Sequence, residues 1–281
     1  MAIEKKLEEE ISKSLISTAK MSTCCVLLEL IHNKEISGKN FVNFEKELLN
    51  SYNRKKSSRA DEFKDDKKKI ALDHFRSQIR LLKSLELIEE NKLTSIGKNV
   101  AGKCINGEYN RFVSFIFFKH MYKNSFVFRE FIKKIREGEY SLDQILDEMG
   151  KLHGLNKYAL NGLKSWSSSL NILLKLGTKV RIESWLEDIA LENLSTSDLT
   201  EFLNSIHEES ESIKENTLFT DFDLRFSNGT LSSDFIEKIF KKLREDNIIY
   251  YNRGKSELIY ITIKTPIKMG NMSLKEYLGS N

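Results

Sequence analysis

Residues that interrupt helices are scarce in this chain. Its 281 residues include a single proline, Pro266, and 13 glycines. Proline removes a backbone donor and clashes with the preceding turn, and glycine costs conformational entropy in a helix, so a chain with few of either can stay helical over long stretches. Hydrophobic residues make up 40% of the chain, which is enough for a sizeable core. We therefore expect a mainly α fold.

One pattern occurs three times: helices with an apolar face lead into a short β-hairpin. In the first occurrence the apolar residues lie three and four positions apart, which places them on one side of each helix. Ile88 and Leu93 then predict a hairpin with its tip at 90–92, and Ser95 is a suitable N-cap for the next helix. The helices expected before this hairpin cover residues 21–33, 41–51 and 68–85.

The second occurrence ends in a longer predicted helix over 157–174, which Gly177 terminates before a strand over 178–182. Ser141, followed three positions later by Gln144, has the pattern of a capping box. The shorter helices expected before this long helix cover residues 109–121, 125–137 and 141–149.

The third occurrence has the clearest hairpin pattern of the three. Strands are predicted over 248–251 and 258–263, and the residues 252–255 form the turn between them. The helices expected before this hairpin cover residues 197–209, 219–225 and 232–245.

A helix that leads into a hairpin is the second half of a winged helix, in which a recognition helix is followed by its wing. The repeated pattern therefore predicts tandem winged helix-turn-helix units, a mainly α fold with small β-hairpin wings. The units are expected over residues 1–107, 108–183 and 184–281, and an acidic linker begins the third.

Charge is sorted along the chain. Residues 51–69 hold eight Lys or Arg and four Asp or Glu, whereas residues 151–182 hold six Lys or Arg and no acid. Residues 183–217 hold ten acids and one lysine. Basic segments are candidates for contact with phosphates, and the acidic segment would be repelled by DNA, so it should face away from DNA or face a protein.

The polar faces of the expected recognition helices hold the candidate DNA contacts. Arginine can pair with guanine and asparagine with adenine, while lysine and serine mostly hold phosphates. Trp166 is expected in the core. The candidates on the first two recognition helices are Lys69, Arg76, Ser77, Arg80, Asn156, Lys157, Asn161, Lys164 and Ser165.

Two further groups of cations supply candidates outside these helices. The tip of the third hairpin carries Arg253 and Lys255, which suit a backbone or minor-groove contact. The segment before the first recognition helix is either a loop that clamps phosphates or an ordinary charged loop. The candidates for the clamp are Arg54, Lys55, Lys56, Arg59 and Lys67 to Lys69.

No catalytic pattern is found in the sequence. The five histidines are scattered, no glycine-rich nucleotide motif occurs, and the three cysteines have neither zinc spacing nor the even number of a disulfide framework. The N-terminus lacks the apolar segment of a secretory signal, and no stretch is long enough to span a bilayer. We expect a cytoplasmic protein, associated with the nucleoid, without a membrane partner, cofactor, metal or catalytic residue.

The segment LELIEENKLTSIGKNVAGK, residues 85–103, resembles winged-helix modules in the DNA-recognition region of type IIS restriction endonucleases and nicking enzymes. Thr94 and Gly97 match a Leu-Thr-x-x-Gly element that many prokaryotic winged-helix regulators share. The resemblance extends loosely to about Ile182. Those endonucleases carry a nuclease domain that this sequence does not show, so the resemblance implies a recognition subunit, a recognition fragment or a relative that works without cleavage.

Three functions follow as expectations. The first is sequence-specific binding of double-stranded DNA in restriction-modification or another antiviral defence system, beside a nuclease or methyltransferase. The second is transcription regulation, usually by a dimer on a palindrome. The third is a docking subunit, for example of an ATPase complex that processes DNA, for which the acidic segment 183–217 is the motive.

Overall fold

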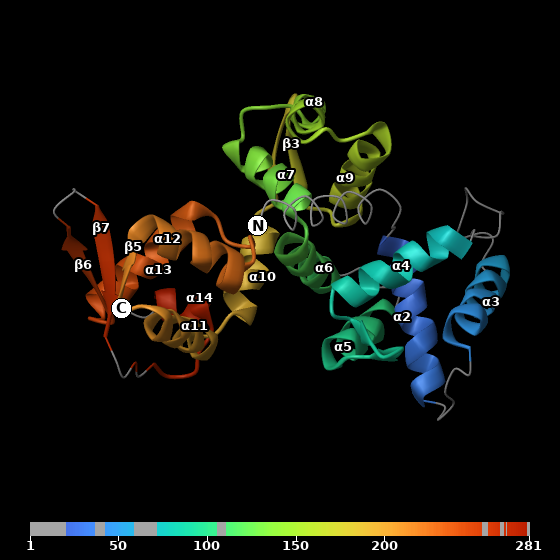
Figure 1. Ribbon diagram of the computed structural model, residues 1–281, viewed down its shortest axis with the longest axis horizontal. Helices are drawn as coiled ribbons and strands as arrows, with labels where there is room; N and C mark the ends of the chain where they lie inside the picture. The colour runs from blue at the N-terminus through green and yellow to red at the C-terminus, as the bar shows by residue number, and fades with distance from the viewer. Residues whose placement is uncertain are drawn as a thin grey trace. The chain divides into compact units, whose positions relative to one another are not determined.

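The computed structural model describes residues 21–36, 43–58, 72–105, 111–254, 258–264, 267 and 269–279. The described chain is mainly helical with small antiparallel sheets (Figure 1), which confirms the expected mainly α class. The chain forms two compact units, Met1–Arg181 and Ile182–Asn281. The predicted boundary at residue 107 falls inside the first unit, and the division into three stays a prediction.

The first unit begins with helices packed around α2 (Met21–Ile36), where Leu27, Leu28 and Ile31 are buried. Helices α3, α4 and α5 all contact α2, which is why its apolar residues are not confined to one face. The other elements of this part are α3 (Phe44–Ser58), α4 (Leu72–Ser84), β1 (Ile88–Glu89), β2 (Lys92–Leu93) and α5 (Ser95–Ile105).

The first hairpin is confirmed, with Ile88 paired to Leu93 and Glu89 to Lys92. Glu90 and Asn91 have φ angles of 45° and 64° and form a two-residue turn. Lys92 therefore belongs to a strand, and the prediction that it forms part of the tip is wrong.

Helix α5 is capped by Thr94, so the prediction of Ser95 as the cap is wrong. The Thr94 hydroxyl accepts a hydrogen bond from the Gly97 amide at 3.0 Å and donates one to the Glu86 carbonyl at 2.8 Å. A Cβ at Gly97 would lie 2.0 Å from the Leu87 carbonyl oxygen. The Leu-Thr-x-x-Gly element thus joins the hairpin to the next helix, and its residues are structural.

The second part of the first unit confirms three of the predicted helices and the capping box at Ser141 and Gln144. Helix α6 is largely buried and contacts α5 on one side and α7 on the other. The elements are α6 (Arg111–Asn124), α7 (Phe126–Glu137), α8 (Leu142–His153), α9 (Lys157–Ser169), β3 (Leu173–Leu176) and β4 (Lys179–Ile182).

Two predicted boundaries in this part are wrong. Helix α8 continues through Gly150 to His153, and the turn is at Gly154, whose φ is 59°. Helix α9 ends at Ser169, because Asn171 adopts a left-handed conformation with φ 53°. Leu173 and Leu174 consequently lie in β3, and Gly177 forms the hairpin turn and does not end the helix.

The second unit contains three strands in the order β5-β7-β6, all antiparallel. Figure 1 shows β6 and β7 beside α13, which contacts β6. The elements are α10 (Trp185–Asn193), α11 (Thr196–Glu209), β5 (Ser212–Lys214), α12 (Glu215–Asp221), the π-helix η1 (Phe222–Ser227), α13 (Ser233–Glu245), β6 (Ile249–Arg253), β7 (Ile259–Ile263) and α14 (Leu274–Gly279).

The expected acidic linker is not a linker. Residues 183–217 hold α10, α11 and β5, and α10 packs against α14. The short helix expected over 219–225 is the end of α12 followed by η1, whose extra residue per turn brings Phe222 into ring contact with Phe202, Phe226 and Phe240. This aromatic cluster holds α13 against α11.

The same backbone junction follows α4, α9 and α13. One residue, Glu86, Asn171 or Asn247, has a positive φ of 53–57° in each case. The amide after it donates to a carbonyl five residues back: Leu87 to Leu82, Ile172 to Ser167 and Ile248 to Leu243. This is the Schellman ending of a helix, and in all three places it turns the chain directly into a hairpin.

Candidate nucleic-acid interface

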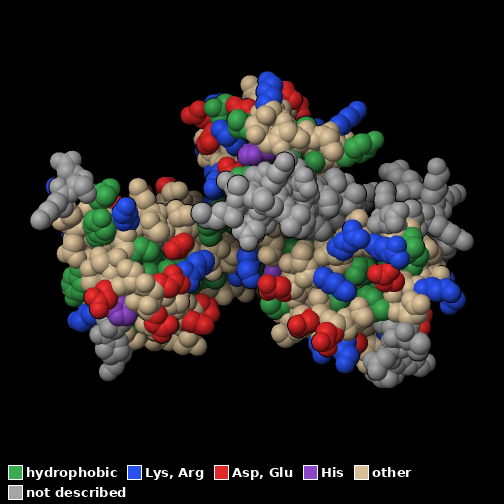
Figure 2. All heavy atoms as spheres, viewed as in Figure 1, with side chains coloured by type: hydrophobic (Ala, Val, Ile, Leu, Met, Phe, Trp, Pro, Cys, Tyr) green, Lys and Arg blue, Asp and Glu red, His purple; other side chains and the backbone are tan. Residues whose placement is uncertain are grey.

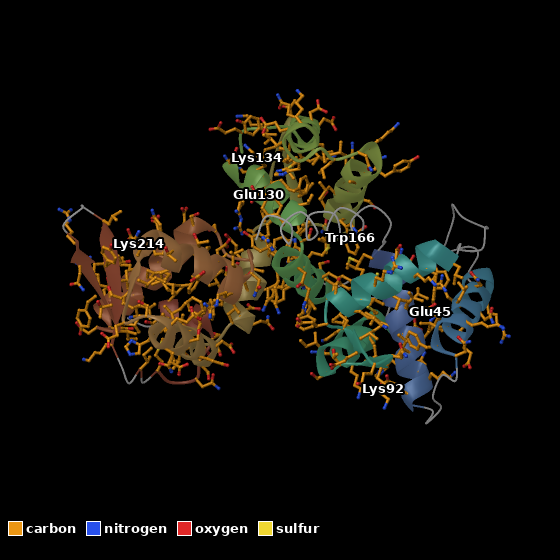
Figure 3. The ribbon with its side chains drawn as sticks, viewed as in Figure 1. Glu45, Lys92, Glu130, Lys134, Trp166 and Lys214 are labelled. Atoms are coloured by element: carbon orange, nitrogen blue, oxygen red, sulfur yellow. The ribbon has the colours of Figure 1, made fainter. Side chains whose placement is uncertain are left out.

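Helix α9 has one buried and one exposed side. Leu163, Trp166 and Leu170 are fully or almost fully buried, and the Trp166 ring lies 5.9 Å from that of Phe117 on α6. Figure 3 shows Trp166 at the end of α9 that faces α6, so the expectation that it belongs to the core is confirmed. Packing of this side fixes which residues the helix presents outward.

The outward side carries most of the residues predicted for the second recognition helix. Lys157, Asn161, Lys164 and Ser165 are all exposed, and Tyr158 lies among them. Asn156 is exposed as well, but its side-chain oxygen accepts a hydrogen bond from the Ala159 amide at 3.0 Å and caps the helix. The exposed polar side of α9 has the composition required to contact phosphates and base edges.

Every cation of the acid-free segment 151–182 is exposed. Lys164 lies 3.4 Å from Asp143 on α8, an exposed pair that contributes little. Among the described residues no carboxylate pairs with the other five, so their charge is available to a ligand. These five are Lys151, Lys157, Lys175, Lys179 and Arg181.

The hairpin β3–β4 adds three of those cations beside the helix. Lys175, Lys179 and Arg181 are exposed on its two strands, and the Arg181 side chain passes over Gly138 at the end of α7. Sequence reasoning predicted the strand over 178–182 but continued the helix to residue 174, so it missed β3 and did not count these three residues as candidate contacts. The alternation of charged and apolar residues from 173 to 182 could have identified the hairpin.

Cations on α7 behave differently. Lys133 lies 2.9 Å from Glu130, and Lys134 lies 3.3 Å from both Glu137 and Glu148 (Figure 3). Hydrogen bonds to Glu137 and Glu148 raise the pKa of Lys134. Lys133 and Lys134 on α7 are thus neutralised within the fold, whereas Lys164 is the one cation of α9 and its hairpin for which a described carboxylate forms an ion pair.

Helix α4 presents a second basic surface. Arg76 and Arg80 are exposed and Ser77 is half-buried, while Lys69 lies outside the described residues. Figure 2 shows Lys and Arg side chains gathered over α4 with acidic ones close by, and Arg76 forms an ion pair of 3.0 Å with Glu45 on α3. Half of the arginine charge on this helix is therefore already paired.

The predicted phosphate-clamping loop is wrong over its first residues. Arg54, Lys55 and Lys56 lie on α3, which continues to Ser58. Lys55 forms an ion pair with the buried carboxylate of Glu29, so its side chain is part of the packing. Arg54 is exposed; the side chain of Lys56 and the residues 59–71, with Arg59 and Lys67 to Lys69, lie outside the described part.

In the second unit the acidic residues are partly used within the fold. Asp198 completes the capping box of α11 with Ser195, the Glu187 carboxylate accepts a hydrogen bond from the Ser232 amide at 2.9 Å, and Glu209 pairs with Arg225 at 2.8 Å. Hydrogen bonds from Arg225 lower the pKa of Glu209. Arg253 is exposed at the end of β6, and Lys255 lies outside the described residues.

Other chemistry finds little support in the described residues. No group of three His, Cys, Asp or Glu residues there could hold a metal ion. Burial raises the pKa of the Cys24 thiol, and a hydrogen bond with Cys104 raises that of Cys25, which makes both poor nucleophiles. Burial lowers the pKa of His120 to about 4. None of the described helices is long and apolar enough to cross a membrane.

Comparison with protein-family models, with curated proteins and with solved structures finds no match for this chain. The basic surfaces of α4 and α9 therefore have to be interpreted from their own geometry and charge.

Proposed function

We propose that this chain is a sequence-specific double-stranded DNA-binding protein with three winged-helix modules. Each module would end in a recognition helix, α4, α9 or α13, followed by its wing, β1–β2, β3–β4 or β6–β7. The observation that carries the proposal is the exposed, acid-free basic surface formed by α9 and the hairpin after it.

The topology of the second unit supports the winged-helix interpretation. Its elements follow the order helix, strand, helix, helix, hairpin, from α11 to β7. The strand β5 lies after the first helix and pairs with β7, the second strand of the hairpin. A winged helix has this arrangement, because the first strand completes the sheet that the wing extends.

The first unit contains shorter versions of the same pairing. The Val180 amide on β4 donates to the carbonyl of Tyr140, which lies between α7 and α8, at 3.1 Å. The Leu93 amide on β2 donates to the Glu35 side chain at the end of α2 at 2.8 Å. In one place a carbonyl between α7 and α8, and in the other a carboxylate in the last turn of α2, accepts a hydrogen bond from the second strand of the hairpin. The three proposed modules would thus share their helix ending and a contact of this kind to the hairpin.

A recognition helix contacts base edges in the major groove, and its wing contacts the backbone or the minor groove. On α9 the exposed Asn161 is flanked by Lys157 and Lys164, and Lys175 and Lys179 lie on the wing. Asparagine can bond bidentately to adenine, and lysines hold phosphates. The α4 surface, with Arg76 and Arg80, would make the second contact.

The third module favours a protein partner. The exposed side of α13 mixes Glu237 and Glu245 with Lys238, Lys241 and Arg244. This surface carries charges of both signs and little net charge. It therefore gains little binding energy from phosphates, and its charges can pair with complementary ones on a protein surface. We therefore propose that this module docks a partner subunit, such as a nuclease, methyltransferase or ATPase of a restriction or defence system. Transcription regulation is the alternative role for the same DNA-binding modules.

The test is enrichment of bound duplexes from a random library with the full chain, followed by affinity measurements on the enriched site. The variant Lys157→Ala/Lys164→Ala should bind at least roughly tenfold more weakly at moderate salt, since each lost phosphate contact removes about 0.9 from the slope of log K against log salt. The matched control is Lys98→Ala/Lys133→Ala, which removes the same charge from exposed positions on α5 and α7.

Two results would contradict the proposal. If no sequence is enriched, the protein is not sequence-specific. If the control pair weakens binding as much as the α9 pair, the basic surface of α9 is not the interface and only net charge matters.

A further inference from the structure

Tyr158 is the most exposed large hydrophobic side chain among the described residues, with 75% of its surface accessible. It lies in the first turn of α9, on the exposed side of the helix. An exposed side chain has no reason from packing within the fold to be aromatic. Transfer of a phenol ring out of water is favourable. The ring therefore suits a surface that α9 covers when a ligand is bound.

The neighbours of Tyr158 limit what that ligand can be. At 100° per residue, Asn161 lies in the middle of the exposed side, with Tyr158 and Ser165 on one flank and Lys157 and Lys164 on the other. A cationic edge, an amide and an apolar ring on one helix side match a groove lined by phosphates, base edges and methyl groups. No acidic side chain lies on α9 to oppose this contact.

We propose that Tyr158 contacts the 5-methyl group of a thymine in the major groove, next to an adenine bonded by Asn161. The inference rests on the proposed function and deepens it, since it assigns an A·T-containing element to the α9 module. The thymine methyl is the apolar group that the major groove offers, and apolar side chains identify it by contact. The aromatic ring, not the hydroxyl, is the group that carries the preference.

The experiment replaces each thymine of the enriched duplex by deoxyuridine, one position at a time, which removes only the methyl group. The full-length wild-type protein should lose roughly fourfold in affinity at one position, the value of one buried methyl-sized group. Tyr158→Phe, the conservative control, should show the same loss. Tyr158→Ala should bind the thymine and deoxyuridine duplexes equally.

The outcomes separate this inference from the proposed function. If the α9 lysines contribute to affinity but wild type and Tyr158→Ala respond alike at every substituted position, the thymine contact is overturned and DNA binding stands. If the effect persists in Tyr158→Ala, another residue contacts the methyl group and the inference is wrong. If no duplex is enriched, both fail.

Discussion

Replacement of Gly97 by alanine should destabilise the first unit, because the new methyl group meets a fixed backbone atom. The Cβ would lie 2.0 Å from the Leu87 oxygen, well inside the 3.0 Å that Cβ atoms keep. That oxygen already accepts a hydrogen bond from the Thr94 amide at 3.2 Å, so it cannot move away freely. Overpacking costs about 1–3 kcal/mol and a lost hydrogen bond about 1 kcal/mol, against about 1 kcal/mol gained by alanine in a helix.

The net expectation is a loss of about 2 kcal/mol, which for a unit of this size lowers Tm by about 4–8 °C. Gly102 on the same helix is the matched control: nothing lies within 4 Å of its added Cβ, so Gly102→Ala should gain up to about 1 kcal/mol. Unfolding is followed by Trp166 fluorescence on a Trp185→Phe background. Trp166, in the first unit, is then the single tryptophan of the chain. A Gly97→Ala protein as stable as Gly102→Ala would refute the reasoning.

Three further outcomes are expected. Lys55→Ala should lower the free energy of unfolding by about 2 kcal/mol, since Glu29 loses its partner in a buried position, without changing the salt dependence of DNA binding; an unchanged denaturant midpoint would contradict it. Lys175→Ala/Lys179→Ala should reduce the salt slope by about 0.9 per lysine while leaving Tm unchanged. Wild type should lose stability as pH falls from 6.5 to about 4, because unfolding lets His120 bind a proton that the folded state excludes; a Tm series should show a smaller loss in His120→Leu.

Helices with a regular apolar side and a cap were predictable from the sequence. Helix α8 begins at the capping box of Ser141, and α13 has a continuous buried stripe. The end of α9 was not predictable from periodicity, because Leu170, Leu173 and Leu174 fit a continuing helix equally well. The left-handed Asn171 ends it, and only an alignment of the segments 85–88, 170–173 and 246–249 reveals that three helices share this ending.

Charge-rich segments misled the sequence interpretation most. Residues 51–58 and the acidic residues before the helix expected over 197–209 were interpreted as a loop and a linker, but they lie on α3 and α10, where Lys55 pairs with Glu29 and Glu192 with Lys275. Partners 26 or more positions away are invisible to local patterns. For the same reason the exposed side of α9 was predictable from its spacing, whereas the pairing of Arg76 with Glu45 was not.

The central claim, that α9 and its hairpin contact duplex DNA, is tested most directly by lysine reactivity. Acetylation of the full chain with and without the enriched duplex, quantified at each lysine, compares the proposed interface with the rest of the surface. Binding should protect Lys157, Lys164, Lys175 and Lys179 and leave Lys98 and Lys133 unchanged. Protection confined to other lysines, or equal protection at all of them, would contradict the claim.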